Sequence, residues 1–140
     1  MNDNTEKARS ILIEGGYTCV ICNDDHVMTF TERGVKPLLS LLDTKESFKG
    51  YSAADKVVGK ASAMIYTLLD VDEVYAPVMT TGAIDVLSKS GIKVYHDEEV
   101  EIIINRQGTG MCPMEDAVIH SSTAIDAVER IRIRLSELSN

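Results

Sequence analysis

The fold is decided by "EVYAPVMTTGAIDVLSKSGIKVYH", residues 73–96. Two short apolar runs, 73–79 and 91–96, flank the helix-like stretch 80–90, and Gly91 follows its end. This pattern is typical of a βαβ unit, in which two adjacent parallel strands are joined by a right-handed helical crossover. Thr80 and Thr81 are the expected N-caps of the helix. The stretch therefore predicts an α/β fold built on a partly parallel sheet.

The residues before this unit predict a hairpin between helices. A first helix is expected over 4–16, with Asn4 or Thr5 as its N-cap and two glycines at its end. Residues 17–34, "YTCVICNDDHVMTFTERG", read as two strands joined by a turn of Asn and Asp. A short helix over 35–43 begins at Pro37.

A longer helix is expected over 53–70, from the even spacing of its apolar residues. The predicted buried face consists of Val58, Ala61, Ile65, Leu68 and Leu69, while Lys56 and Lys60 share another face. Beyond the βαβ unit, "VEIIIN" (100–105) predicts a final strand, and Pro113 begins a helical region that breaks near 120–124. Together these elements predict a central mixed sheet with helices on both faces.

Composition limits the class of protein. A chain of 140 residues with 44% apolar content predicts one domain over 1–140 with a real core. The net charge of -8 disfavours nucleic-acid binding, which needs clustered basic side chains. Arg130, Arg132 and Arg134 fan around a helix and are expected to be solvated. No run is apolar enough to span a membrane and no signal peptide is recognised, so we expect a cytoplasmic protein.

The cysteines and histidines do not predict a metal site or a disulfide framework. An odd count of three cysteines favours reduced thiols. Cys19 and Cys22 lie in a predicted strand, where alternation sends them to opposite faces. The three histidines are scattered without metal-ligand spacing. The sequence therefore predicts neither a bound metal nor a cofactor.

The most chemically suggestive stretch is "NRQGTGMCPMED", residues 105–116. Pro113 fits the first position of a helix, Cys112 its N-cap, and Glu115 the third position of a capping box. A cysteine there is either a thiolate activated by the helix end, and so a candidate nucleophile, or only part of a cap. The expected ligand contacts around it are Asn105, Arg106, Gly108, Gly110 and Glu115, with Arg106 positioned to pair with an anion.

Asp55 is the second candidate catalytic residue. It is expected near the start of the helix over 53–70, where a carboxylate is favoured by the helix dipole, and it is either a cap or a base. Lys56 and Lys60 are either solvated charges or contacts to an anion. The hydroxyls of Thr80 and Thr81 are further candidate ligand contacts.

Three stretches, "SAADKVVGKASAM", "VYAPVMTTGAIDVLSKSGIKV" and "INRQGTGMCPMEDAV", resemble a bacterial and archaeal family, domain of unknown function 1893. The resemblance implies a three-layer αβα fold of the cytidine deaminase-like superfamily. A zinc deaminase has H-A-E or C-A-E and P-C-x-x-C motifs. This chain has Ala53-Ala54-Asp55 at the first motif and no cysteine in 77–82 at the second, so a zinc-free protein is expected.

These observations predict a small-molecule site for an anionic, nucleoside-like or nucleotide-like ligand. Asp55 and the two threonine hydroxyls would contact its polar part, and Arg106 and the glycine loop an anionic group. Cys112 would be a contact or a nucleophile, and whether the protein is an enzyme stays open. The alternative is a non-catalytic regulatory or interaction module with a vestigial pocket. Exposed sheet edges favour a homo-oligomer.

Overall fold

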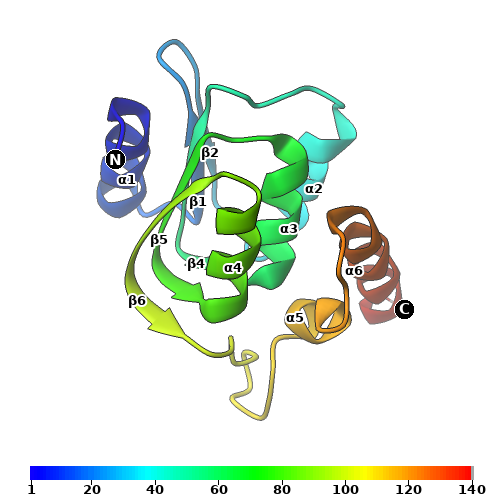
Figure 1. Cartoon of the computed structure of the whole chain (residues 1–140). Coiled ribbons are helices and arrows are strands. Elements are labelled where there is room, and N and C mark those ends of the chain that lie inside the picture. The colour runs from blue at the N-terminus through cyan, green and yellow to red at the C-terminus, as the bar shows by residue number, and fades with distance from the viewer. Residues whose placement is uncertain (140) are drawn as a thin grey trace.

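A computed structural model describes residues 1–139. In chain order the elements are α1 (Asp3–Gly15), β1 (Cys19–Cys22), β2 (Val27–Phe30), α2 (Lys36–Asp43), β3 (Ser52–Asp55), β4 (Val57–Val58), α3 (Lys60–Leu69), β5 (Glu73–Thr80), α4 (Thr81–Lys89), β6 (Lys93–Val100), α5 (Pro113–Val118) and α6 (Ala124–Leu138). Figure 1 shows the strands at the centre, with helices around them. None of the helices described is long and apolar enough to cross a membrane.

The strands form one mixed sheet. The antiparallel hairpin of β1 and β2 lies at one end, β1 also pairs with β3 antiparallel, and the remaining pairs are parallel. Strands β3 and β4 follow each other along one edge of β5 in the same register, since Ser52 pairs with Glu73 and Val57 with Val78. β6 occupies the other edge of β5.

The break between β3 and β4 falls beside Pro77 of β5, and the pairing of β5 with β6 also skips this residue. Proline has no N–H to donate, so it interrupts a ladder in the middle of a sheet. Asp55 and Lys56 lie at this interruption. Asp55 therefore ends its strand at the point where the pairing with β5 is interrupted.

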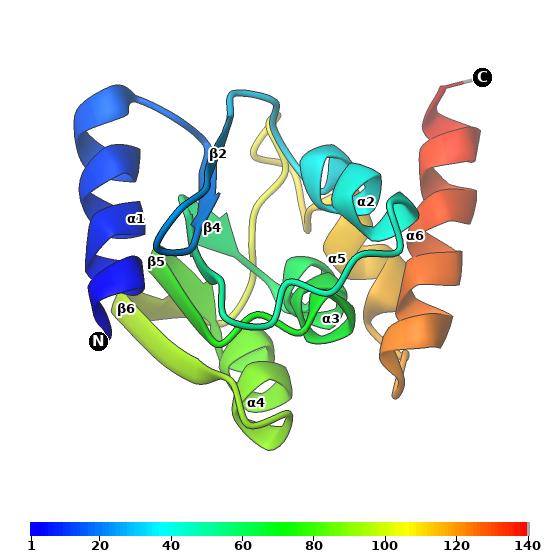
Figure 2. The same ribbon diagram turned by 90° about the horizontal axis from the view of Figure 1, so that it is seen from above.

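Helices cover the sheet in layers, and Figure 2 shows α1 on one side with the other helices on the opposite side. Ala8 and Leu12 of α1 pack against Val20, Ala54 and Tyr75. The larger core lies on the other face, where α3 packs against α2, α4 and α6. The predicted three-layer αβα architecture with a central mixed sheet is confirmed.

Several predicted elements are confirmed. The hairpin, the helix that begins near Pro37, the βαβ unit β5-α4-β6, the start of α5 at Pro113 and the break before α6 all lie where the sequence placed them. Cys19 and Cys22 point to opposite faces of β1, because each belongs to a different core cluster. All three cysteines are free thiols.

The predicted N-cap of the first helix, Asn4 or Thr5, is wrong by two or three residues. Asn2 is the N-cap, and its side chain accepts a hydrogen bond from the Thr5 N–H at 2.8 Å. Thr5 is buried, and its hydroxyl donates to Oε1 of Glu73 at 2.7 Å. The end is as predicted, at Gly16 in the left-handed conformation.

The predicted helix over 53–70 is wrong in its first half. Residues 52–55 form β3 and 57–58 form β4, and α3 begins only at Lys60. Val58 is therefore a strand residue, Lys56 and Lys60 do not share a helix face, and Leu68 is 36% exposed. The buried environment overrides the helical preference of the alanines, since neighbouring strands on both sides of β3 supply its hydrogen bonds.

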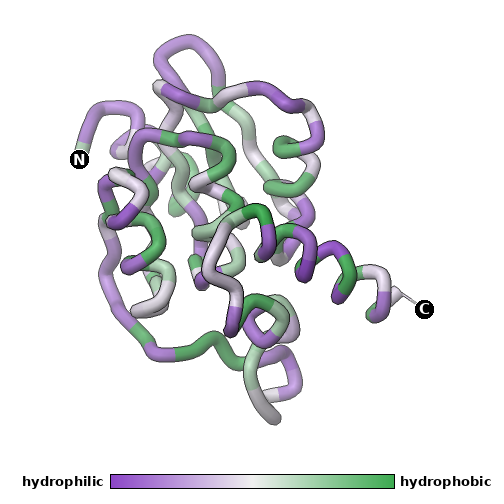
Figure 3. The backbone as a smooth tube through the Cα atoms, turned by 45° about the vertical axis from the view of Figure 1, so that its right-hand side comes forward, coloured by the Kyte–Doolittle hydropathy of each residue, from purple (hydrophilic) through white to green (hydrophobic). Residues whose placement is uncertain are grey.

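The predicted strand over 100–105 is also wrong. β6 is longer than expected and ends at Val100. Between β6 and α5, a part of the chain that the structure describes in full, strand-like pairing is limited to a single bridge between Ile104 and Met111. Figure 3 shows this segment as a hydrophobic stretch at the bottom of the molecule, after the hydrophilic strand β6. β-Branched residues favour strands, but here they have no further strand to pair with.

Candidate functional site

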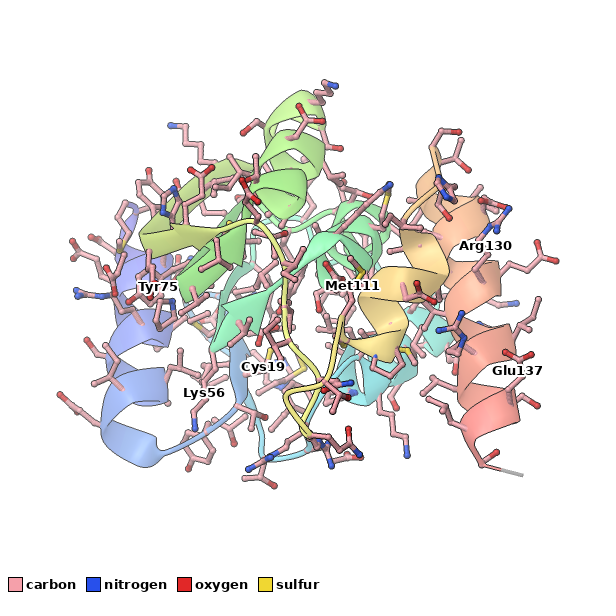
Figure 4. The ribbon with its side chains drawn as sticks, turned by 90° about the horizontal axis from the view of Figure 1, so that it is seen from below. Cys19, Lys56, Tyr75, Met111, Arg130 and Glu137 are labelled. Carbon is pink, nitrogen blue, oxygen red and sulfur yellow. The ribbon has the colours of Figure 1, made fainter. Side chains whose placement is uncertain are left out.

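A pocket of about 860 Å³ lies beside the end of β4 and the start of α3. Its walls come from the segment before α2 and the first residue of that helix (32–36), from Val57, Gly59, Ala61 and Ser62, from 103–107, from the start of α5 (112–115) and from α6. In Figure 4 the segment between β6 and α5, on which Met111 is labelled, runs down between the sheet and α5. The volume is that of an ordinary small-molecule site.

One wall of the pocket is a short hairpin over 103–112. The Cys112 N–H donates to the Ile103 carbonyl at 2.8 Å, and the Asn105 N–H to the Gly110 carbonyl at 2.7 Å. The Asn105 side chain closes the turn, because its Oδ1 accepts from the Thr109 N–H and its Nδ2 donates to the Thr109 hydroxyl. Gly108 adopts a positive φ of 72°. Asn105 and Gly108 thus shape the turn, and Arg106 projects from it.

Glu115 does not form the predicted capping box of its own helix. Cys112 is the N-cap of α5 by position, but within residues 1–139 its side chain makes no capping hydrogen bond. The Glu115 carboxylate instead accepts hydrogen bonds, each of 2.8 Å, from the backbone N–H groups of Lys60 and Ala61, at the start of α3. Burial raises the pKa of Glu115, and these N–H groups oppose that rise.

Gly59 allows this contact. It is the N-cap of α3 and has an extended backbone that any residue adopts. A Cβ at this position would overlap the Glu115 carboxylate. Glu115 thereby joins α5 to α3 across the pocket, and it fills the helix end at which the sequence had placed Asp55.

Asp55 lies at the end of β3 and not at a helix start, which corrects the prediction. Its Oδ2 accepts a hydrogen bond of 2.8 Å from the Tyr66 hydroxyl, and the Cys19 thiol lies 3.3 Å from the same hydroxyl. Desolvation by burial raises the pKa of Asp55 to about 7, while hydrogen bonds from Tyr66 and from backbone N–H groups oppose the rise.

Sequence reasoning missed Tyr66 and Cys19. Burial also raises the pKa of the Cys19 thiol and of the Tyr66 hydroxyl well above their ordinary values. The available signal was a tyrosine on the apolar face of α3, because a buried tyrosine hydroxyl needs a hydrogen-bond partner. Together Asp55, Tyr66 and Cys19 form a hydrogen-bonded triad that joins β3, α3 and β1, with Cys19 and Tyr66 buried and Asp55 half-buried.

The structure separates the predicted site residues into two groups. Asn105, Arg106, Cys112 and Glu115 line the pocket. Among the residues described, the pocket lining does not include Asp55, Lys56, Lys60, Thr80, Thr81, Gly108 or Gly110.

The side chains outside the lining have other contacts. The Lys60 Nζ donates to the Ile119 carbonyl at 3.3 Å, and Lys56 is exposed. Thr80 alone caps α4, since its hydroxyl accepts from the Ala83 N–H at 3.0 Å. Thr81 is the first helical residue, and its hydroxyl donates to Oε2 of Glu99.

Two basic residues of the pocket were not singled out in the sequence. Arg33 lies between β2 and α2 and Lys36 is the first residue of α2, and with Arg106 they place three cations on the lining. The signal was their spacing in "TERGVKP", directly after the hairpin. Among residues 1–139, no group of three or more His, Cys, Asp or Glu side chains could hold a metal ion.

The fold and the pocket define a three-layer αβα protein with a ligand-sized pocket at the start of α3. The family model described as "TM1506: Domain of unknown function (DUF1893)" matches residues 7–135. The chain therefore belongs to the DUF1893 family, as its motifs predicted. A search of curated protein sequences gives no match.

Two solved structures are similar to the chain. The crystal structure of the DUF1893 family protein TM1506 from Thermotoga maritima has a TM-score of 0.84 and 25% identity, over 98% of this chain and 92% of that chain. The apo crystal structure of dCMP deaminase from the cyanophage S-TIM5 has a TM-score of 0.44 and 15% identity, over 71% of this chain and 100% of that chain.

Proposed function

We propose that the pocket binds a small anionic ligand. The observation that carries this proposal is the distribution of partners among the arginines. Arg9 lies over the ring of Tyr75, and Arg130, Arg132 and Arg134 form ion pairs with carboxylates. Within residues 1–139, the two arginines without such a partner are Arg33 and Arg106, and both line the pocket.

Charge at the pocket supports an anion as the ligand. Lys36 adds a third cation, and it too forms no ion pair in the described part of the chain. Two carboxylates also line the pocket, Glu32 and Glu115, but that of Glu115 is held by the N–H groups at the start of α3. A local excess of cations in a chain of net charge -8 attracts anions against the overall field.

The absence of aromatic side chains from the described pocket lining argues against a nucleobase as part of the ligand. None of the residues that line the pocket in the described part of the chain is aromatic. A nucleobase would therefore have no ring on which to stack. A Cys-based activity stays a prediction, because Cys112 lines the pocket but Asp55 belongs to the separate triad. We therefore propose that the ligand binds through an anionic group and not through a base.

The test is ligand-dependent protection of Cys112. Cys112 is half-buried in the pocket, whereas Cys19 and Cys22 are 4% and 0% exposed, so iodoacetamide reports on Cys112. Inorganic phosphate, citrate and adenosine monophosphate are the probes. A binding anion should slow alkylation and, at ten times its Kd, stabilise the fold by about 1.4 kcal/mol in a thermal-shift assay.

The matched variants are Arg106→Gln and Arg130→Gln, because both remove one exposed arginine but only Arg106 lines the pocket. We expect Arg106→Gln to weaken binding about tenfold and Arg130→Gln to leave it unchanged. If no anion protects Cys112 or raises the melting temperature, the proposal is wrong and the non-catalytic interaction module becomes the better explanation.

A further inference from the structure

The pocket residues other than the three cations indicate what the uncharged part of the ligand is made of. Aliphatic side chains enter the pocket from the segment before α2, from β4, from the 103–112 hairpin, from α5 and from α6, and they are Val35, Val57, Ile103, Ile104, Met114 and Leu135. Leu138 of α6 adds another. The lining is thus aliphatic, with cations on two of its segments.

Three of these side chains are unusually exposed. Val57 is 41%, Ile104 52% and Leu138 58% exposed, although the core of the protein is well buried. Exposed apolar side chains scattered singly need no explanation, but these three share one pocket. An apolar ligand would remove them from water together.

Few hydrogen-bonding side chains remain for a polar ligand body. The Asn105 amide is used inside the hairpin, and the Glu115 carboxylate is used at the start of α3. Ser62, Gln107 and Glu32 are the other neutral or acidic polar side chains of the lining. A sugar or a base needs more such groups, arranged around it, than this pocket offers.

From this combination we infer that the ligand is an aliphatic anion, an alkyl or acyl chain that ends in a carboxylate or a phosphate. The chain would lie against the aliphatic side chains, and Arg33, Lys36 and Arg106 would hold the charged end. This inference rests on the proposed function and specifies the chemical class of the ligand.

The experiment is a titration of the full chain by calorimetry with butyrate, hexanoate, octanoate and decanoate, each below its micellar concentration. Each CH2 group that leaves water should tighten Kd about fourfold. We expect at least three such steps, or about sixtyfold, between butyrate and decanoate. Decyl phosphate tests the alternative charged end, and decanol tests the chain without a charge.

Three variants locate the effect. Ile104→Asp changes an isoleucine in the pocket, and Ile133→Asp changes one on α6 that is exposed to the same degree, 54% against 52%. Ile104→Asp should weaken decanoate at least tenfold, and Ile133→Asp should leave its Kd unchanged. Arg106→Gln should weaken decanoate and leave decanol unaffected.

The outcomes separate this inference from the proposed function. If phosphate binds with dependence on Arg106 but Kd does not fall with chain length, the pocket is an anion site and the aliphatic inference is overturned. If decanol binds as tightly as decanoate, or if both aspartate variants act alike, the inference is also overturned. If phosphate, citrate, adenosine monophosphate and decanoate all fail to bind, both proposals are wrong.

Discussion

Replacing Gly59 with alanine should break the contact that joins α5 to α3. The extended backbone of Gly59 accepts any residue, so the substitution does not strain the chain itself. The added Cβ would overlap the Glu115 carboxylate, which must then leave the start of α3. Two hydrogen bonds of 2.8 Å from backbone N–H groups to a carboxylate would be lost.

The expected cost follows from those bonds. A helix cap contributes about 1 kcal/mol, and hydrogen bonds to a charged group contribute about 1.5 to 3 kcal/mol. Water can reach the freed N–H groups through the pocket, which reduces the loss, and we expect about 2 kcal/mol. Alanine is also a poorer N-cap than glycine by about 0.5 kcal/mol. Gly59→Ala should therefore lower the free energy of unfolding by about 2.5 kcal/mol.

A double-mutant cycle in urea isolates the contact. Glu115→Ala alone should cost about 2 kcal/mol, and in that background Gly59→Ala should cost only about 0.5 kcal/mol. Gly82→Ala is the matched control, since the nearest side-chain atom to its added Cβ is Lys60 Cβ at 3.8 Å, an ordinary contact. Because Gly82 lies in α4, this control should be neutral or stabilising by up to about 1 kcal/mol.

The refuting result is a missing coupling energy. If Gly59→Ala costs the same with and without Glu115, the added methyl group does not displace the carboxylate. The bridge between α5 and α3 would then contribute nothing measurable to stability.

Two further predictions concern the triad and the cap of α4. The pKa of Asp55 is about 7 in the folded protein against 3.8 for the unfolded chain, so the folded state holds this proton more tightly. The contribution of Asp55 to the free energy of unfolding is therefore complete below about pH 4 and is lost as the pH rises through 7. Between pH 5 and pH 8 this loss is at most about 3 kcal/mol, measured by urea unfolding at each pH. Asp55→Asn should not show the loss. Tyr66→Phe removes a hydrogen bond that lowers the pKa of Asp55, so the pH at which half of the loss has occurred should rise. In the same assay Thr80→Ala should lower the free energy of unfolding by about 1 kcal/mol, because the hydrogen bond from the Ala83 N–H is lost. The control Thr81→Ala changes an exposed residue and should cost less than about 0.5 kcal/mol. Equal costs would contradict the assignment of Thr80 as the cap.

The parts of the fold that the sequence predicts are those where local pattern and burial agree. β5-α4-β6 and the β1-β2 hairpin have clear apolar periodicity, and Gly, Asn and Pro mark their ends. The prediction for residues 52–58 fails because their alanines favour a helix locally, whereas in the structure both edges and both faces of β3 are covered by neighbouring elements. Small side chains fit that crowded strand, and no local signal reports the crowding.

The candidate site was predictable only within one segment. Asn105, Arg106, Cys112 and Glu115 stand close together in the chain, and all line the pocket. The contact of Glu115 with α3 spans more than fifty residues of sequence, so it follows from the packing of α5 and not from a motif. The isoleucines after β6 have the composition of a strand, but Ile103 and Ile104 line a pocket because β6 is already the edge of the sheet.

Glu115 occupies the helix start at which the sequence placed Asp55, and this changes the chemistry of Asp55. A carboxylate at a helix start is stabilised in its charged form, so the predicted position would have lowered the pKa of Asp55. In the structure Glu115 takes that helix start, and Asp55 lies one strand earlier, against Tyr66. Burial there raises the pKa of Asp55 to about 7. The residue that local sequence marks as a charged cap is therefore the one able to gain and lose a proton near neutral pH.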